Sequence, residues 1–306
     1  MADLSYLQAI VIALLQGITE LFPVSSLGHS VLVPALFGGS WAHLVTESST
    51  PNSEQSPYLA FIVALHVATA IALLLYYRHD WIRIIGGFLR TLRTRRVETS
   101  AERLAWLLVA GTIPVGITGL LLEHLFRALF AKPLAAAIFL TLNGVILFAG
   151  EAIRHRSEQR QPVLTPRAPT TDPTHQQPTR RLDTLEYKEA AVIGLFQTFA
   201  LLAGISRSGI TLVGGLVRGL NHDDAAKFAF LLATPVIFAA GVLKLPVLAG
   251  PAGHNIHGQV LLGALIAAVS SYLSVKFLTC YFQTRTLVPF AIYCLTSGLL
   301  CVLYFA

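Results

Sequence analysis

The feature that most constrains the fold of this chain is a set of long apolar runs. Six segments come close to the roughly 20 residues that an α-helix needs to cross about 30 Å of hydrocarbon. They are residues 58–78, 104–125, 133–151, 225–249, 259–280 and 288–305. Only 12% of the 306 residues are charged and 54% are hydrophobic, so a soluble fold would lack polar side chains to cover its surface. The sequence therefore predicts an all-α polytopic membrane protein with six transmembrane helices and excludes an ordinary cytosolic enzyme.

The positive charge of the chain lies in polar segments between these runs. The formal net charge is +6, and arginines are concentrated at residues 78–103 and 154–181, whereas residues 38–57 and 250–258 contain no Lys or Arg. Because cytoplasmic loops of membrane proteins are enriched in Lys and Arg, we expect the first two segments to be cytoplasmic and the other two to be external. Membrane topology thus accounts for the charge, and we expect no nucleic-acid partner.

Two further apolar segments, residues 4–38 and 184–220, are interrupted by Gly, Pro, Ser and charged or amide residues. Such interruptions at membrane depth are tolerated where the backbone is buried in protein or lines a wet cavity. The two segments match at a constant offset of 181 residues, as an internal repeat does. The matched pairs are Tyr6 and Tyr187, Ala9 and Ala190, Val11 and Val192, Ile12 and Ile193, Leu14 and Leu195, Gln16 and Gln197, Leu21 and Leu202, Ser25 and Ser206, and Gly28 and Gly209. When the crossings are counted from the external segment 38–57, the first interrupted segment begins on the outer side of the membrane and the second begins in the cytoplasm. The two copies of the repeat therefore have opposite orientations, and the sequence predicts two re-entrant helix pairs in an inverted-topology repeat.

A polar stretch divides the chain into two halves. Residues 152–183 are rich in Pro, Thr, Gln and Arg and cannot bury a core, so we expect a cytoplasmic linker there. The first repeat then covers residues 1–151 and the second covers residues 184–306. Each half is predicted to hold one re-entrant pair followed by three crossing helices.

The breaks in the two interrupted segments carry a concentration of polar side chains. In order, they contain Gln16, Glu20, Pro23, Ser25, Ser26, Gly28 and His29, and then Gly204, Ser206, Arg207, Ser208, Gly209 and Thr211. Gln16 and Glu20 are four residues apart and share a helix face, while Arg207 stands among hydroxyls and glycines at the expected start of a half-helix, which suits a phosphate group. A charged side chain in lipid costs at least roughly 2.5–3.5 kcal/mol and usually marks a functional site. The alternative is that Glu20 and Arg207 only lock the hairpins together while the small residues pack.

Isolated residues on the predicted spans support weaker predictions. We expect His66, Thr69, Asn143 and Thr234 to be satisfied core polar groups rather than ligands. Gly111, Gly116 and Gly119 allow close approach of another helix, so a homodimer is one prediction and a monomer is equally compatible.

At the two breaks the chain resembles the undecaprenyl-diphosphatase family, also called bacitracin resistance proteins. The family signatures are an (E/Q)xxxE helix followed by PVSSxGH, and a second motif, PGxSRSGxT. Here they read Gln16-x-x-x-Glu20, Pro23–His29 and Ala203–Thr211, with Ala203 in place of the family's proline. The resemblance implies a phosphatase of the bacterial cytoplasmic membrane that converts undecaprenyl diphosphate to the monophosphate carrier used for peptidoglycan. It also implies a site that opens outward and a divalent cation, Mg²⁺ or Ca²⁺.

Residue roles follow from this resemblance as hypotheses. Arg207 is expected to bind the diphosphate and to stabilise the charge that builds on its oxygens. Glu20, aided by Gln16, is expected to hold the cation or to orient the nucleophile. The predicted substrate-binding residues are Gln16, Ser25, Gly204, Ser206, Ser208, Gly209 and Thr211. Two alternatives stay open for the attack: Ser26 with His29 as general base, or water with His29 as acid and base while Ser26 only binds.

The main rival function is a transporter or flippase for a phosphorylated polyprenyl lipid. Inverted repeats whose broken helices meet in mid-membrane are typical of transporters. His29 beside the serines and the Ser206-Arg207-Ser208 cluster favour chemistry, because transport alone requires no nucleophile.

Overall fold

The computed structural model describes residues 4–47, 57–122, 132–160, 180–249 and 256–306 of the chain. Within these residues every regular element is a helix, as predicted. The α-helices are α1 (Tyr6–Thr19), α2 (Ser26–Phe37), α3 (Gly39–Glu47), α4 (Pro57–Tyr76), α5 (Arg78–Thr94), α6 (Ser100–Leu121), α8 (Pro133–Arg160), α9 (Tyr187–Gln197), α10 (Arg207–Val217), α11 (His222–Ala249), α13 (His257–Tyr281) and α14 (Val288–Phe305). Two short 3₁₀ helices, η2 (Leu182–Thr184) and η3 (Thr198–Leu201), flank α9.

Six of the described helices are long and apolar enough to cross a membrane. These stretches are Tyr58–Tyr76, Ser100–Leu121, Pro133–Arg156, His222–Gly241, His257–Tyr281 and Val288–Phe305. They overlap the six predicted crossing segments, which confirms that prediction; residues 123–125 of the second segment lie outside the described part. Many of the large exposed side chains of α13 and α14 are apolar, such as Leu261, Leu265, Leu300 and Leu303, which suits contact with lipid. The chain is a multi-pass membrane protein.

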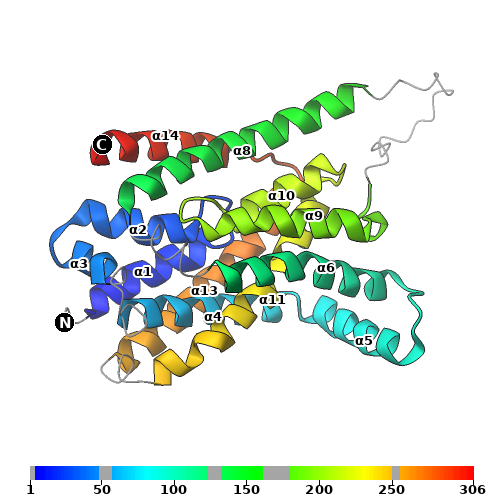
Figure 1. Ribbon diagram of the computed structural model, residues 1–306, viewed down its shortest axis with the longest axis horizontal. Coiled ribbons are helices and arrows are strands. Elements are labelled where there is room, and N and C mark those ends of the chain that lie inside the picture. The colour runs from blue at the N-terminus through cyan, green and yellow to red at the C-terminus, as the bar shows by residue number, and fades with distance from the viewer. Residues whose placement is uncertain (1–3, 48–56, 123–131, 161–179, 250–255) are drawn as a thin grey trace.

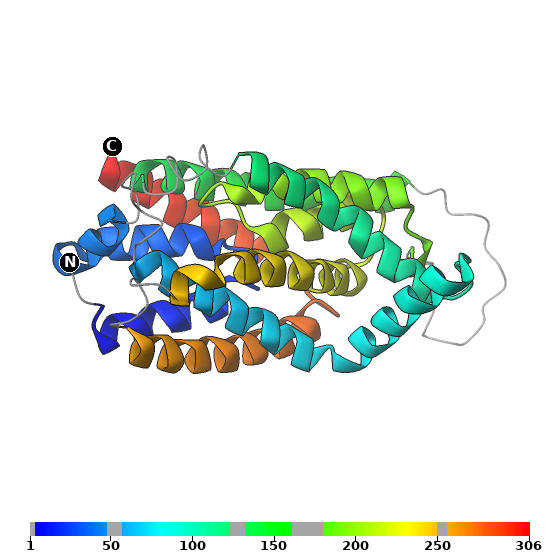
Figure 2. The same cartoon turned by 60° about the horizontal axis from the view of Figure 1, so that its bottom comes forward.

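The long helices run along the longest axis of the molecule (Figures 1 and 2). α14 packs along α8, while α4 packs against both α11 and α13. The shorter helices fill the space between them, with α1 on α13, α9 on α6, and α10 against α8 and α11. Both termini and α3 lie at one end of the molecule, and α5 and the last turns of α8 lie at the other (Figure 1). The two arginine-rich segments therefore begin at the same end.

The four described helices next to the two breaks are too short to cross a bilayer by themselves. α1, α2, α9 and α10 have 14, 12, 11 and 11 residues, so even α1 extends only roughly 21 Å. Serine caps set three of their starts, and two of these caps lie at the breaks. Ser25 Oγ accepts from Gly28 N at 3.3 Å at the start of α2, and Ser206 Oγ accepts from Gly209 N at 3.1 Å at the start of α10. These caps satisfy backbone donors that a helix start leaves free, and they place both breaks at the predicted residues.

The segment 78–103, predicted as a loop, contains the 17-residue helix α5. Its apolar residues Ile82, Ile85, Leu89 and Leu92 are exposed and recur three or four positions apart, between arginines. This pattern is typical of an amphipathic helix that lies at a membrane surface. The prediction of a loop rested on the number of arginines and did not take the helical spacing of the apolar residues into account.

The three glycines linked to chain pairing differ in their surroundings. A Cβ on Gly116 or Gly119 would meet no described atom within 4 Å, whereas a Cβ on Gly111 would lie 3.1 Å from Leu232 of α11. Gly111 therefore serves packing within the chain. The homodimer stays a prediction. Of the three glycines, only Gly116 and Gly119 have space beside them for a helix of a second chain.

Candidate active site

The two helix breaks are in direct contact. Gly204 N donates to Ser25 Oγ at 3.1 Å, and a Cβ added to Gly28 would lie 2.9 Å from Cα of Gly204. Gly204 also has a φ of +115°, which side chains other than hydrogen rarely permit. Glycine at both positions is what allows the backbones to approach so closely. The breaks thus meet inside the helix bundle.

Asn143 of α8 links the two breaks. Its Nδ2 donates to the Pro23 carbonyl at 3.0 Å, and its Oδ1 accepts from Ser206 N at 2.9 Å. The side chain is fully buried. Asn143 is therefore a core polar group, as expected, and it additionally holds the two breaks together.

We expect Asn143→Leu to lower the free energy of unfolding by about 2–5 kcal/mol, because it leaves the Pro23 carbonyl and the Ser206 N–H buried with a bonding partner removed. Thermal unfolding in detergent measures this. Thr141→Val on the same helix is the matched control, since the Thr141 hydroxyl bonds only its own helix, to Ala137 O at 3.0 Å. An Asn143→Leu melting temperature equal to that of the control would contradict the bridging role.

Glu20, just after α1, is the centre of a polar cluster. Its side chain is buried, with 7% of the residue exposed, and its Oε1 pairs with Arg207 Nη2. Its Oε2 accepts from Ser26 Oγ and, at 3.0 Å, from Gln16 Nε2. His66 Nε2 lies 3.4 Å from the same oxygen. The structure therefore brings a serine hydroxyl, a carboxylate and a guanidinium into contact, which is a set of groups suited to phosphoryl transfer.

The second break places hydroxyl groups around Arg207, the first residue of α10. Ser206 Oγ lies 3.0 Å from Ser208 Oγ and also caps Gly209 N. Thr211 Oγ1 is buried without a hydrogen-bond partner among the described residues. The N-terminal end of a helix carries partial positive charge. The predicted substrate-binding residues of this motif thus lie together at a positive helix end, and their roles stay predictions.

His29 lies outside the Glu20 cluster. Its Nδ1 is 2.7 Å from the Ser25 carbonyl and its Nε2 is 2.8 Å from Tyr293 Oη. Because the carbonyl can only accept, Nδ1 carries the hydrogen, and the neutral ring then accepts from the tyrosine at Nε2. Among the described contacts His29 has no hydrogen bond to Ser26. Its role as general base or acid stays a prediction.

His66 is the residue at this site that the sequence interpretation missed. Its Nδ1 lies 2.8 Å from the Ile62 carbonyl and therefore carries the hydrogen, which leaves Nε2 toward Glu20. The sequence interpretation took His66 for a core polar group because nothing near it in the sequence suggests a motif. The available signal was an ionisable side chain in the middle of an apolar span.

The polar cluster borders a cavity of about 190 Å³. Its polar lining residues are Glu20, Ser25, Ser26, His66, Gln197, Ser206 and Arg207, contributed by both breaks and by α4 and α9. A cavity of this size can admit a phosphate group. The structure thus gathers five of the eleven predicted site residues around one hollow, namely Glu20, Ser25, Ser26, Ser206 and Arg207.

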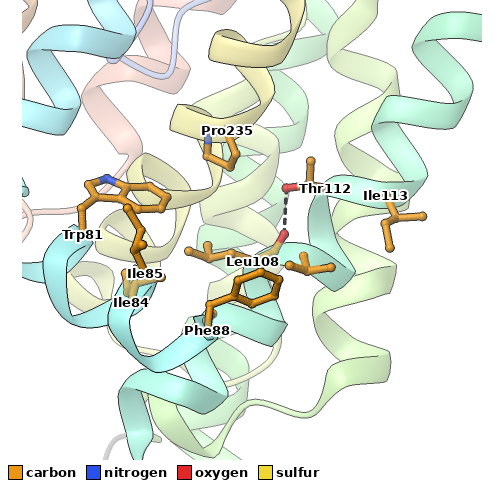
Figure 3. A pocket seen from close by; sticks show the side chains of 10 residues that line it. Trp81, Ile84, Ile85, Phe88, Leu108, Thr112, Ile113 and Pro235 are labelled. Atoms are coloured by element: carbon orange, nitrogen blue, oxygen red, sulfur yellow. Dashed lines mark hydrogen bonds between the residues drawn. The ribbon is translucent and has the colours of Figure 1, made fainter. Parts of the chain in front are cut away.

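A second cavity, of about 280 Å³, lies between α5, α6 and α11 and has a different character (Figure 3). Its walls are apolar, with Trp81, Phe88 and Ile113 among them. The hydroxyl of Thr112 is bonded to the Leu108 carbonyl at 2.7 Å. This cavity offers no ionisable side chain, whereas Glu20, His66 and Arg207 all line the cavity beside the polar cluster, which is therefore the candidate active site.

Comparison with known proteins identifies the family of this chain. The sequence pattern of the family described as bacitracin resistance protein BacA matches residues 9–300. The chain is 64% identical to undecaprenyl-diphosphatase 2 of Frankia alni, over 100% of this chain and 99% of the relative. It is 56% identical to an undecaprenyl-diphosphatase of Mycolicibacterium paratuberculosis, over 97% and 96%, and 43% identical to undecaprenyl-diphosphatase 2 of Burkholderia orbicola, over 96% and 95%. A match over almost the whole length, with both helix-break motifs inside it, shows that this chain belongs to the bacitracin resistance protein BacA family.

Proposed function

We propose that this chain is an integral membrane phosphatase that hydrolyses undecaprenyl diphosphate to undecaprenyl phosphate and orthophosphate. One observation carries the chemistry: Ser26 and Arg207 both contact the buried carboxylate of Glu20 beside a polar cavity between membrane helices. The assignment of undecaprenyl diphosphate as the substrate rests on the names of the relatives. The product is the lipid carrier for peptidoglycan synthesis, and its regeneration accounts for bacitracin resistance.

Arg207 and the start of α10 are the proposed phosphate-binding elements. A guanidinium can match phosphate oxygens with paired donors, and the helix start adds partial positive charge. In the described structure Nη1 donates to the Ala233 carbonyl at 3.0 Å and Nη2 pairs with Glu20, so phosphate would share or replace these partners. The hydroxyls of Ser206 and Ser208 and the backbone of Gly204 and Gly209 complete this proposed set. As charge shifts between the oxygens during transfer, these fixed donors stabilise the transition state.

Ser26 is the proposed nucleophile. Its Oγ attacks the terminal phosphorus, the bond from that phosphorus to the bridging oxygen breaks, and undecaprenyl phosphate leaves with that oxygen. The hydroxyl proton passes to Glu20, which already accepts a hydrogen bond from Ser26. Water then hydrolyses the phosphoserine, and Ser26 takes its proton back from Glu20 as orthophosphate leaves. This contact favours Ser26 over direct attack by water, because both ring nitrogens of His29 are engaged elsewhere.

The residues present fit a divalent cation shared with the substrate. Gln16 Oε1 is buried without a hydrogen-bond partner among the described residues, while Gln16 Nε2 bonds Glu20. Mg²⁺ typically binds one or two carboxylates together with substrate phosphates, so Glu20 and Gln16 would hold Mg²⁺ or Ca²⁺ with the diphosphate. When bound, such an ion neutralises charge on the phosphate oxygens. The described part of the chain has no cluster of three ionisable ligands, and substrate oxygens together with water would complete the coordination.

The proposed architecture is an inverted repeat of two re-entrant pairs, α1–α2 and α9–α10, in halves 1–151 and 184–306 joined by the linker 152–183. The linker was predicted without a helix, but its residues 152–160 are the last turns of α8. The short helices and the contact between their breaks support it. So does Figure 1, in which α1 and α2 extend toward the end that holds both termini, and α9 and α10 extend toward the end that holds α5.

The proposed location is the bacterial cytoplasmic membrane, with the arginine-rich end in the cytoplasm and the active site opening to the outer side. The charge distribution supports this orientation, because α5 and the end of α8 lie at one end (Figure 2). The proposed partners are the polyprenyl diphosphate and the bilayer, with a second copy of the chain at Gly116 and Gly119.

Orthophosphate release from undecaprenyl diphosphate by the purified wild-type protein tests the function. Release is expected in detergent with Mg²⁺ or Ca²⁺ and is expected to fall on addition of a chelator. No release under any cation, together with substrate-dependent lipid movement in liposomes, would contradict the phosphatase and favour the transporter.

A further inference from the structure

Gln197, the last residue of α9, is a buried side chain with nothing in the described protein to bond. It is 1% exposed, and neither Oε1 nor Nε2 has a hydrogen-bond partner among the described residues. Buried amides are nearly always paired, because burial without a partner is unfavourable. An amide with both ends unpaired therefore points to a partner outside the described protein.

Gln197 lies at the candidate active site. Gln197 lines the same hollow as Glu20, Ser26 and Arg207. Its amide, with two N–H donors and one acceptor oxygen, thus belongs to the wall of the space where the reacting group of a substrate would lie. No other role in the described structure accounts for a polar side chain at this position.

Comparison with the repeat counterpart shows what Gln197 lacks. Its counterpart at the offset of 181 residues is Gln16, whose Nε2 donates to the Glu20 carboxylate at 3.0 Å. Four residues beyond Gln197 the corresponding position is Leu201. The second amide therefore holds the equivalent position in the sequence repeat but lacks the carboxylate that the first one bonds four residues later.

We propose that the side-chain amide of Gln197 donates a hydrogen bond to a non-bridging phosphate oxygen of the bound diphosphate, which makes it a further substrate-binding residue. The inference rests on the proposed function. A diphosphate has more anionic oxygens than the fork of Arg207 can bond, and Arg207 already shares its charge with Glu20. A neutral donor at Gln197 bonds a further oxygen and adds no charge to the buried cluster.

Gln197→Met is the decisive variant, because it keeps the length of the side chain and removes the donor. We expect kcat/KM for phosphate release to fall roughly 10- to 100-fold, the effect of losing a hydrogen bond to a charged group. The melting temperature of the ligand-free protein should be unchanged or higher, since the amide bonds no protein group. Its increase on adding methylenediphosphonate, a diphosphate analogue that cannot be hydrolysed, should be smaller than in the wild type.

Two further variants complete the test. Gln197→Glu keeps the shape but replaces a donor with a negative charge, and it should lose more activity than Gln197→Met. Gln8→Met is the matched control, because Gln8 is a buried amide outside the cavity whose Oε1 accepts from Ser5 N at 2.9 Å. It should lower the melting temperature and leave kcat/KM of the folded protein unchanged.

The outcomes separate this inference from the proposed function. No release by the wild type means that the function itself is wrong. Release by both the wild type and Gln197→Met at equal kcat/KM, with equal stabilisation by the analogue, means that the amide bonds only water and overturns the inference. A melting temperature of ligand-free Gln197→Met as low as that of Gln8→Met means that Gln197 supports the fold, which also overturns it.

Discussion

Arg207→Ala is expected to lower kcat/KM for orthophosphate release by roughly 10³- to 10⁵-fold, the range seen when an arginine that stabilises a transferring phosphoryl group is lost. The guanidinium is the one cation of the cluster whose charge does not depend on pH, and it pairs with Glu20 beside the cavity. Its removal takes away both the fork that binds the phosphate and the charge that stabilises the transition state. Phosphate release by purified protein in detergent, at equal concentrations of folded enzyme, measures the effect.

Stability must be separated from chemistry in this experiment. Arg207→Ala leaves the Glu20 carboxylate buried with its partner removed, which costs about 3–5 kcal/mol of folding free energy. The double variant Glu20→Gln with Arg207→Met removes both charges, so its melting temperature should recover while its activity does not. Arg207→Lys keeps the charge without the fork and should retain intermediate activity. Folded Arg207→Ala that turns over substrate at a rate close to the wild type would remove the basis for this active site.

The sequence predicted the features that depend on local pattern. The apolar runs gave the six long helices because crossing a bilayer requires both length and hydrophobicity, and both are visible in sequence. The breaks were also predictable, since Ser25 and Ser206 precede their helices as capping residues and Gly28 and Gly204 allow the two backbones to meet. In these segments local preference and the tertiary structure agree.

Features that depend on distant contacts were not predictable. His66 reaches Glu20 from a different helix, and Asn143 bonds both breaks from α8; no spacing within the chain links these residues to the motifs. His29 shows the converse. Its position three residues after Ser26 suggested a catalytic pair, yet Tyr293 on α14 accounts for its Nε2, because the rotation of a helix about its axis depends on what packs against it.

The second large effect is expected at Ser26. Ser26→Ala should reduce turnover by roughly 10³-fold or more, because an attacking hydroxyl cannot be replaced by a methyl group. Rapid quenching of wild-type protein with substrate labelled in the terminal phosphate should trap label on Ser26. Glu20→Gln should slow formation of this phosphoserine by roughly 10²- to 10⁴-fold, the usual contribution of a general base.

Matched variants decide which group accepts the proton. Ser30 lies one turn beyond Ser26 on α2, and its buried hydroxyl bonds no described residue. Ser30→Ala should therefore leave turnover unchanged. His29→Asn should slow the reaction less than Glu20→Gln if the carboxylate is the base, and more if the sequence-based assignment of His29 is right. Label absent from Ser26, with Ser26→Ala near normal turnover, would mean that water attacks the phosphorus directly. In that case the contact between Ser26 and Glu20 serves only to position the first break, and the cavity must hold the attacking water.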